Sequence, residues 1–305
     1  MSESVDSAAA PPSTPPTGKR LVLHIGFHET QTMVIQESMF GFRVGLRDHG
    51  VVYPQPLSGH QSHLDLATAL GFNPRLGELS EFNGQAVVER YRRLVEDCPA
   101  GSTIVVSSEE FCQGNFRPFA MENLKVFLDK LTVDTTVVGY SRDPVQFLLA
   151  IYHHELRDTL SRSRFGEWLD HFDLAGADFD RRLEPWRELT ADVGGYQAEL
   201  RIRDYDIVRA EGVPLLVDFL ATTGLGPIEM LSVEHPVSEI HPLLVEALIA
   251  VRQAELDPDQ RRLHLEHLLE ISALMAPVDA ATVHLGQPAA ADLARRLAEL
   301  RVGRH

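Results

Sequence analysis

Three short polar segments each follow an apolar run that is typical of a buried strand. They are residues 26–32, 107–111 and 141–144. In a parallel sheet the carboxyl ends of the strands share one edge, and ligands bind there, at the N-termini of the helices that follow. A turn from strand to helix directs backbone N–H groups and the positive end of the helix dipole at an anion such as phosphate. The three segments therefore predict one ligand site built from distant parts of the chain.

The elements that must position these segments alternate between strand and helix, which predicts crossover connections and a parallel sheet with flanking helices. Apolar runs typical of strands cover residues 21–25 and 103–106, residues 135–140 are rich in β-forming types, and residues 51–53 and 200–202 are further candidate strands. Helical patterns cover residues 30–47, 63–70, 86–96, 123–131, 143–157, 213–223, 241–255, 258–274 and 289–300. We expect an α/β fold with a disordered tail at residues 1–18, then a single domain at 19–305 with a helical cap from about residue 237.

Five segments resemble, in the right order, those of bacterial sulfotransferases, which use 3′-phosphoadenosine 5′-phosphosulfate (PAPS) as the sulfuryl donor. The first is LVLHIGFHETQTMVIQ at residues 21–36, and the family pattern there is close to H-I-G-x-x-K-T-G-T-T-x-x-Q. The others are GVVYP, VVSSEEF, VVGYSRDPVQFLLAIYHHELR and LRIRDYDIVRAEGVPLLVDFLATTGL. The resemblance covers roughly residues 20–225 and implies the P-loop-like α/β fold of that family; the C-terminal quarter matches only in being helical.

The resemblance implies a phosphosulfate-binding loop, and this chain departs from the family there. Gly26, Thr30 and Thr32 match the pattern and are the residues expected to bind a cofactor. Glu29, however, stands at the position of the family's lysine, and Gln31 stands at the loop glycine. The lysine neutralises the phosphosulfate and assists the departing oxygen, so a carboxylate in its place opposes binding of the same ligand.

The second phosphate contact is also altered. In the family an arginine and a serine eight residues later bind the 3′-phosphate of the nucleotide. Arg142 stands at the arginine position, but Ala150 at the serine position has no hydroxyl group to donate. Loss of two separate contacts indicates that PAPS is no longer the ligand. We expect no certain cofactor, and PAPS only if the chain is an active sulfotransferase.

Several His and Glu side chains line the predicted mouth. In the family the glutamate that Glu109 matches lies near the acceptor, so Glu109 is the expected base of an active enzyme, with His63 behind it. His28 and Glu29 are the other catalytic candidates, and Glu29 could instead bind a cationic group such as a substrate amine. The alternatives are that residues 107–109 only cap the next helix and that Glu29 only stabilises a helix start. A mixed N/O metal site has no support from the spacing, and we expect none.

Three classes of function stay open at this point. The first is a divergent enzyme of the sulfotransferase fold that acts on a small molecule with another donor or none. The second is an active PAPS-dependent sulfotransferase that modifies a hydroxyl group or an amine. The third is a non-catalytic binding or partner protein. Binding of the nucleotide separates the second class from the other two.

The composition narrows the choice of partner. A net charge of −16 argues against nucleic acid and against an anionic membrane surface, because both attract clustered Lys and Arg. The two cysteines, Cys98 and Cys112, indicate reduced thiols rather than a disulfide framework, and no apolar run is long enough to span a membrane. We therefore expect a cytoplasmic protein with a small-molecule substrate. The apolar helices after His241 could pack on the sheet or form a homo-oligomer interface.

Overall fold

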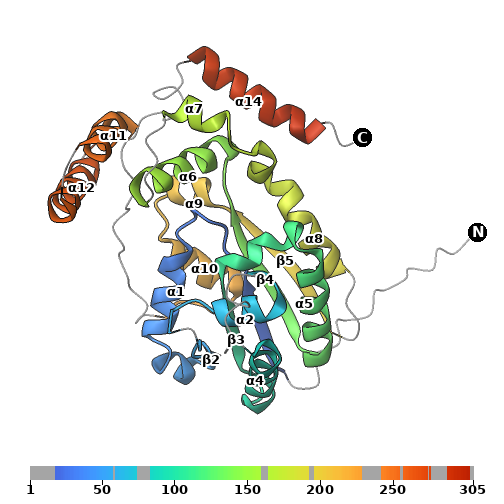
Figure 1. Cartoon of the computed structure of the whole chain (residues 1–305). Helices are drawn as coiled ribbons and strands as arrows, with labels where there is room; N and C mark the ends of the chain where they lie inside the picture. The colour runs from blue at the N-terminus through green and yellow to red at the C-terminus, as the bar shows by residue number, and fades with distance from the viewer. Residues whose placement is uncertain are drawn as a thin grey trace, which may run out of the picture.

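A parallel sheet occupies the centre of the computed structural model, which describes residues 18–57, 59–73, 83–158, 164–191, 196–228, 242–254, 257–273, 275 and 287–302 (Figure 1). Its five strands follow the order β2-β3-β1-β4-β5. Their bounds are β1 Arg20–His24, β2 Val51–Val52, β3 Thr103–Ser107, β4 Asp134–Ser141 and β5 Ala198–Asp204. In register, His24 at the end of β1 pairs with Ser107 of β3 and with Val138 of β4. The three polar segments predicted to share an edge therefore follow three adjacent strands.

Helices cover both faces of this sheet. The bounds are α1 Thr32–Gly41, α2 Leu64–Leu70, α4 Gly84–Asp97, α5 Pro118–Leu131, α6 Pro144–Asp158, α7 Phe165–Leu169, α8 Phe179–Ala191, α9 Tyr205–Ala210, α10 Leu215–Thr223, α11 Val245–Gln253, α12 Pro258–Ala273 and α14 Gln287–Val302. Short 3-10 helices are η1 Gly45–His49, η2 Glu109–Phe116, η3 Leu174–Ala177 and η4 Pro242–Leu244. The predicted α/β class, a parallel sheet with flanking helices, is confirmed.

Two hydrophobic clusters join the helices to the sheet. On one face Ile35 and Met39 of α1 pack with Phe219 of α10 against the central strands. On the other face the cluster draws on α2, α4, α5, α6 and α8, and it buries Trp186 completely. All five residues of β3 are buried, as expected for a parallel strand covered on both faces. The two layers hold the carboxyl edge of the sheet in a fixed position.

Four differences from the predicted elements have identifiable causes. The first predicted helix is split into α1 and η1 by a turn after Gly41, and α5 begins early, at Pro118, a favoured first-turn residue. The helix α9, which was not predicted, begins where the Asp204 side chain accepts from the Ile207 N–H. The helix α8 was missed as well, since it contains Pro185 in its interior, where proline usually ends a helix.

The C-terminal helices α11 and α14 are joined to the rest of the fold through α6. Leu248 of α11 and Leu293 of α14 are buried in the larger cluster, and both helices contact α6. The predicted tail, apart from Gly18, and the predicted boundary near residue 237 lie outside the described residues. No helix within the described part of the chain has the length and apolar character needed to cross a membrane.

Candidate functional site

The loop after β1, residues 25–31, folds back on its own backbone. Thr30 Oγ1 donates to the Phe27 carbonyl oxygen at 2.7 Å, and Thr32 Oγ1 donates to the same oxygen at 3.3 Å. Both threonines are almost completely buried. In this arrangement the two hydroxyl groups stabilise the loop and are already engaged, although both were expected to contact a cofactor.

The same loop holds two residues in the left-handed backbone region. Glu29 has φ 62° and Gln31 has φ 54°, and Gln31 is the N-cap of α1 without a side-chain capping bond. A side chain in this region costs about 1 kcal/mol at each position, and glycine avoids the cost. Gln31 occupies the position where the resemblance implies glycine, and its backbone has a conformation that glycine adopts without this cost. Backbone strain of this kind clusters at functional sites, so it supports a functional role for this loop at the carboxyl edge of the sheet.

Gly26 is required by close packing inside this loop. A Cβ atom added at Gly26 would lie 2.5 Å from both Cγ2 and Oγ1 of Thr32, closer than real Cβ contacts. We expect Gly26→Ala to lower the free energy of unfolding by about 2 kcal/mol in urea titration, because a short, buried threonine cannot move aside. Thr32→Ala removes both clashing atoms, so the double variant should recover about 1 kcal/mol of this loss. A Gly26→Ala protein as stable as the parent would show that the loop relaxes freely.

Arg142, at the end of β4, is buried and holds the loop in place. Its Nη1 donates to the Glu29 carbonyl oxygen at 2.8 Å, and its Nε donates to Asp206 Oδ1 at 3.1 Å. The guanidinium also lies over the Tyr205 ring, 5.1 Å from its centre. Asp206 balances the charge that was expected to bind a 3′-phosphate, and Ala150 nearby in sequence is buried without a hydroxyl group. The structure therefore gives Arg142 a positioning role for the loop.

Glu29 turns its carboxylate toward α6. His154 Nδ1 lies 3.2 Å from Glu29 Oε1, and the Glu29 side chain is 22% exposed while that of His154 is 47% exposed. The pair is near the surface, so its contribution to stability is small. The Glu29 carboxylate is thus partly exposed to solvent, while the Glu29 carbonyl oxygen accepts a hydrogen bond from Arg142.

His63, which was predicted to line the mouth, lies in the interior, as does His24 at the end of β1. The Ser107 N–H donates to His63 Nδ1 at 3.0 Å, so Nε2 carries the proton and donates to the Pro54 carbonyl at 3.1 Å. His24 Nδ1 lies 2.8 Å from Ser107 Oγ, and its Nε2 finds no hydrogen-bond partner within the described ranges. Burial lowers the pKa of His24 to about 3 and that of His63 to about 4, the latter despite the nearby Asp65 carboxylate. Both rings are neutral and join β1 and β3 to their surroundings.

His28 lies on the loop after β1, beside η2. It is half-buried, its Nε2 lies 3.4 Å from the Gln113 amide nitrogen, and its ring shares a hydrogen bond with Cys112. Burial opposes protonation, yet the Cys112 sulfur and the Glu109 carboxylate together raise the pKa of His28 to about 9. The structure therefore brings the predicted residues His28 and Glu109 into one electrostatic cluster.

Cys112 and Arg182 are members of this cluster that the sequence did not predict. Arg182 of α8 donates from Nη2 to Cys112 Sγ at 3.1 Å. Neither residue lies in a motif with the other, and 70 positions separate them. No spacing pattern signals such a pair, because α8 and η2 meet only in the folded chain.

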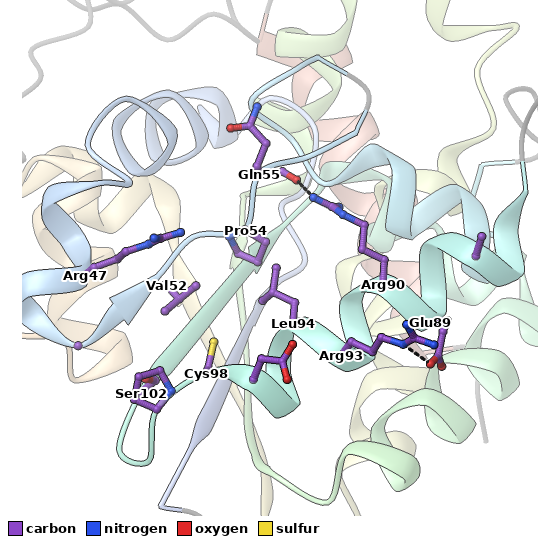
Figure 2. Close-up of a pocket in the computed structure, with 14 residues that line it drawn as sticks. Arg47, Val52, Pro54, Gln55, Glu89, Arg90, Arg93, Leu94, Cys98 and Ser102 are labelled. Atoms are coloured by element: carbon purple, nitrogen blue, oxygen red, sulfur yellow. Dashed lines mark hydrogen bonds and ion pairs between the residues drawn. The ribbon is translucent and has the colours of Figure 1, made fainter.

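Two hollows adjoin the sheet. A groove of about 910 Å³ runs along the edge strand β2 beside α4, and none of the predicted site residues lines it. Figure 2 shows Arg90 directed at the Gln55 carbonyl and Arg93 at Glu89, so two of its arginines are engaged. A second hollow of about 610 Å³ lies at the carboxyl ends of β4 and β5 and is lined in part by Arg142.

The described residues contain no group of three or more His, Cys, Asp or Glu side chains arranged to hold a metal ion.

Comparisons with known proteins give one structural match. No family model and no curated protein matches the chain. The crystal structure of a sulfotransferase from Alicyclobacillus acidocaldarius is similar, with a TM-score of 0.40 and 15% sequence identity. The match covers 82% of this chain and 95% of that chain.

Proposed function

We propose that this protein is a divergent enzyme of the sulfotransferase family that acts on a small molecule and no longer uses PAPS. The observation that carries the proposal is the state of the two anion contacts. Glu29 places a carboxylate in the loop, and Arg142 is held by Asp206 and by the Glu29 carbonyl oxygen. A nucleotide with two phosphate groups would meet one repelling group and one arginine that is already neutralised.

The size of the repulsion between the Glu29 carboxylate and a phosphate group indicates whether a nucleotide such as PAPS can bind. Two unit charges about 4 Å apart at an effective dielectric constant near 20 interact by roughly 4 kcal/mol. A carboxylate at Glu29 therefore opposes a phosphate by about as much as the family's lysine would favour it. Partial exposure of Glu29 reduces both values, and half of the difference is still enough to remove micromolar affinity.

His28 and Glu109 are the proposed acid–base groups. His28 is protonated at neutral pH, so it can donate a proton or a hydrogen bond to a bound substrate. Glu109 is half-buried at the start of η2, and its carboxylate favours the charged form of His28. His63, the base first expected behind Glu109, has both ring nitrogens engaged, and the proposal does not use it. Glu29 would bind a cationic group of the substrate, such as an amine.

Calorimetric titration with adenosine 3′,5′-bisphosphate, the nucleotide product of sulfuryl transfer, tests the proposal. We expect no binding at millimolar nucleotide, and the same result for Arg142→Ala, because Arg142 does not offer its charge to a ligand. Micromolar binding that Arg142→Ala weakens would overturn the proposal and favour an active PAPS-dependent sulfotransferase.

A further inference from the structure

We propose that Cys112 is an oxidisable thiolate, held by His28 and Arg182, which small uncharged oxidants such as hydrogen peroxide convert to a sulfenic acid. The site lies under the loop that follows β1. The proposal does not depend on which substrate the protein binds. It would make the protein sensitive to peroxide at one defined sulfur atom. The inference rests on the contacts of Arg182 and His28 with the sulfur and on the buried positive charge of Arg182.

Arg182 supplies the first argument, because its charge is buried. The residue is 3% exposed, and a guanidinium keeps its proton at any ordinary pH. Apart from the Cys112 sulfur at 3.1 Å, it donates to the Gly176 carbonyl oxygen at 3.3 Å. Its other close neighbours are the faces of three aromatic rings, those of Phe27, Phe147 and Phe179. No carboxylate within the described ranges forms an ion pair with Arg182, so the anion that balances this charge is the Cys112 thiolate.

His28 supplies the second argument. Its hydrogen bond to Cys112 adds another positive group to the same sulfur, and each of the pair stabilises the charged form of the other. Burial raises the pKa of Cys112, and Glu110 raises it as well, but Arg182 and His28 together bring it below the ordinary value. Glu109 faces His28 and favours its protonation. The charged groups that act on the sulfur thus come from the loop, from η2 and from α8.

One donor beside the sulfur lacks an acceptor. Arg182 Nε is buried and finds no hydrogen-bond partner in the described part of the chain. A buried N–H group without an acceptor is costly, and an oxygen atom bound to the sulfur or approaching it would satisfy such a donor. The guanidinium is therefore suited to stabilise the oxygen of peroxide during the reaction and that of the sulfenic acid afterwards.

The chemistry balances with the groups present. The Cys112 thiolate attacks one oxygen of hydrogen peroxide, so an S–O bond forms and the O–O bond breaks. The leaving hydroxide takes the proton of the His28 imidazolium and departs as water. The sulfur loses two electrons, the peroxide gains two, and the products are sulfenic acid, water and neutral His28.

Access to the sulfur selects for small reagents. Cys112 has no exposed surface, whereas His28, its hydrogen-bond partner, is half-buried. We expect only a small reagent such as hydrogen peroxide to reach the sulfur, by displacement of the His28 ring. Cys98 lies before β3 and Cys112 lies after it, and the strand between them alone spans about 13 Å, which is too far for a disulfide. Burial raises the pKa of Cys98, so it serves as an internal control.

Peroxide labelling of the full chain tests the proposal without any variant. The protein is treated with hydrogen peroxide, quenched with catalase and unfolded in dimedone, and the two cysteine peptides are quantified by mass spectrometry. We expect Cys112 to be labelled about tenfold faster than Cys98 at pH 7. Its rate should rise less steeply with pH between 6.5 and 8 than that of Cys98, because a thiol with an ordinary or raised pKa gains about tenfold per unit. Labelling of Cys112 no faster than Cys98, or with the same pH dependence, would overturn the proposal.

Thiolate absorbance near 240 nm provides a second measurement. The Cys98→Ser variant has Cys112 as its single cysteine. This variant should show thiolate absorbance at pH 7 that disappears in acid. His28→Gln in the same background should raise the pH at which the absorbance appears. Absence of the absorbance contradicts the proposed ion pair. Absorbance without peroxide labelling would identify an inert structural ion pair and would equally overturn the site.

Discussion

Glu29→Lys should restore affinity for a nucleotide bisphosphate, with binding of adenosine 3′,5′-bisphosphate about 100-fold tighter than in the parent at low salt. The substitution removes a repulsion and adds an attraction, each worth roughly 4 kcal/mol at most. Screening at a side chain that is 22% exposed reduces the sum, and about 3 kcal/mol corresponds to the stated factor. We expect the loop to need no rebuilding, because Gln31, at the position where the resemblance implies glycine, already has a left-handed backbone conformation.

Two further variants separate local charge from total charge. Glu29→Gln removes only the repulsion, so it should gain about tenfold in affinity by the same calculation. Glu188→Lys makes the same change in net charge at an exposed position in the last turns of α8, and it should bind the nucleotide no better than the parent. A small diamine, 1,4-diaminobutane, probes the opposite preference and should lose binding in Glu29→Lys. A Glu29→Lys protein indifferent to both ligands would show that Glu29 serves only the loop.

The sheet was predictable because parallel strands are buried on both faces. Residues 103–106 form an apolar run and residues 135–140 are rich in β-branched side chains, and each segment lies within a buried strand of the structure. The position of the predicted edge followed from the topology, since residues 26, 107 and 141 come at or directly after the ends of three neighbouring strands. Helix α8 was not predictable in the same way, because Pro185 interrupts its pattern and only tertiary packing of Trp186 and Leu183 compensates.

The site was predictable only where one segment supplies both the residue and its surroundings. The sequence indicated an unusual loop from Glu29 and Gln31 alone, and both residues have left-handed backbone conformations. Arg142 was placed correctly at a strand end, but its partner Asp206 is 64 residues away and belongs to α9. His63 looked like a reactive group, whereas the fold encloses it between the Ser107 and Pro54 backbones. Sequence position does not reveal burial, and burial decides whether a histidine is a catalyst or part of the core.

The buried histidines should make the protein sensitive to mild acid, with about 4 kcal/mol of stability lost between pH 7 and pH 5. The folded-state pKa values are about 3 for His24 and about 4 for His63, and the unfolded value is near 6.5. Between these limits the unfolded chain binds protons that the folded chain does not, so stability rises with pH and falls as the pH drops below 6.5. Each histidine contributes about 1.4 kcal/mol per pH unit over this window.

Urea titration at pH 5, 6, 7 and 8 measures this loss, and variants assign it. His24→Gln and His63→Gln should each flatten the dependence between pH 7 and 5 by about 2 kcal/mol, whereas His267→Gln, on an exposed face of α12, should leave it unchanged. His28 acts in the other direction, since its pKa is raised to about 9; its contribution is complete below pH 6.5 and disappears only as the pH rises through 9. It therefore offsets only a small part of the acid loss, about 1 kcal/mol. If both glutamine variants keep the dependence of the parent, the two rings are protonated in the folded protein, and the hydrogen bonds that join β1 and β3 through Ser107 must be arranged differently.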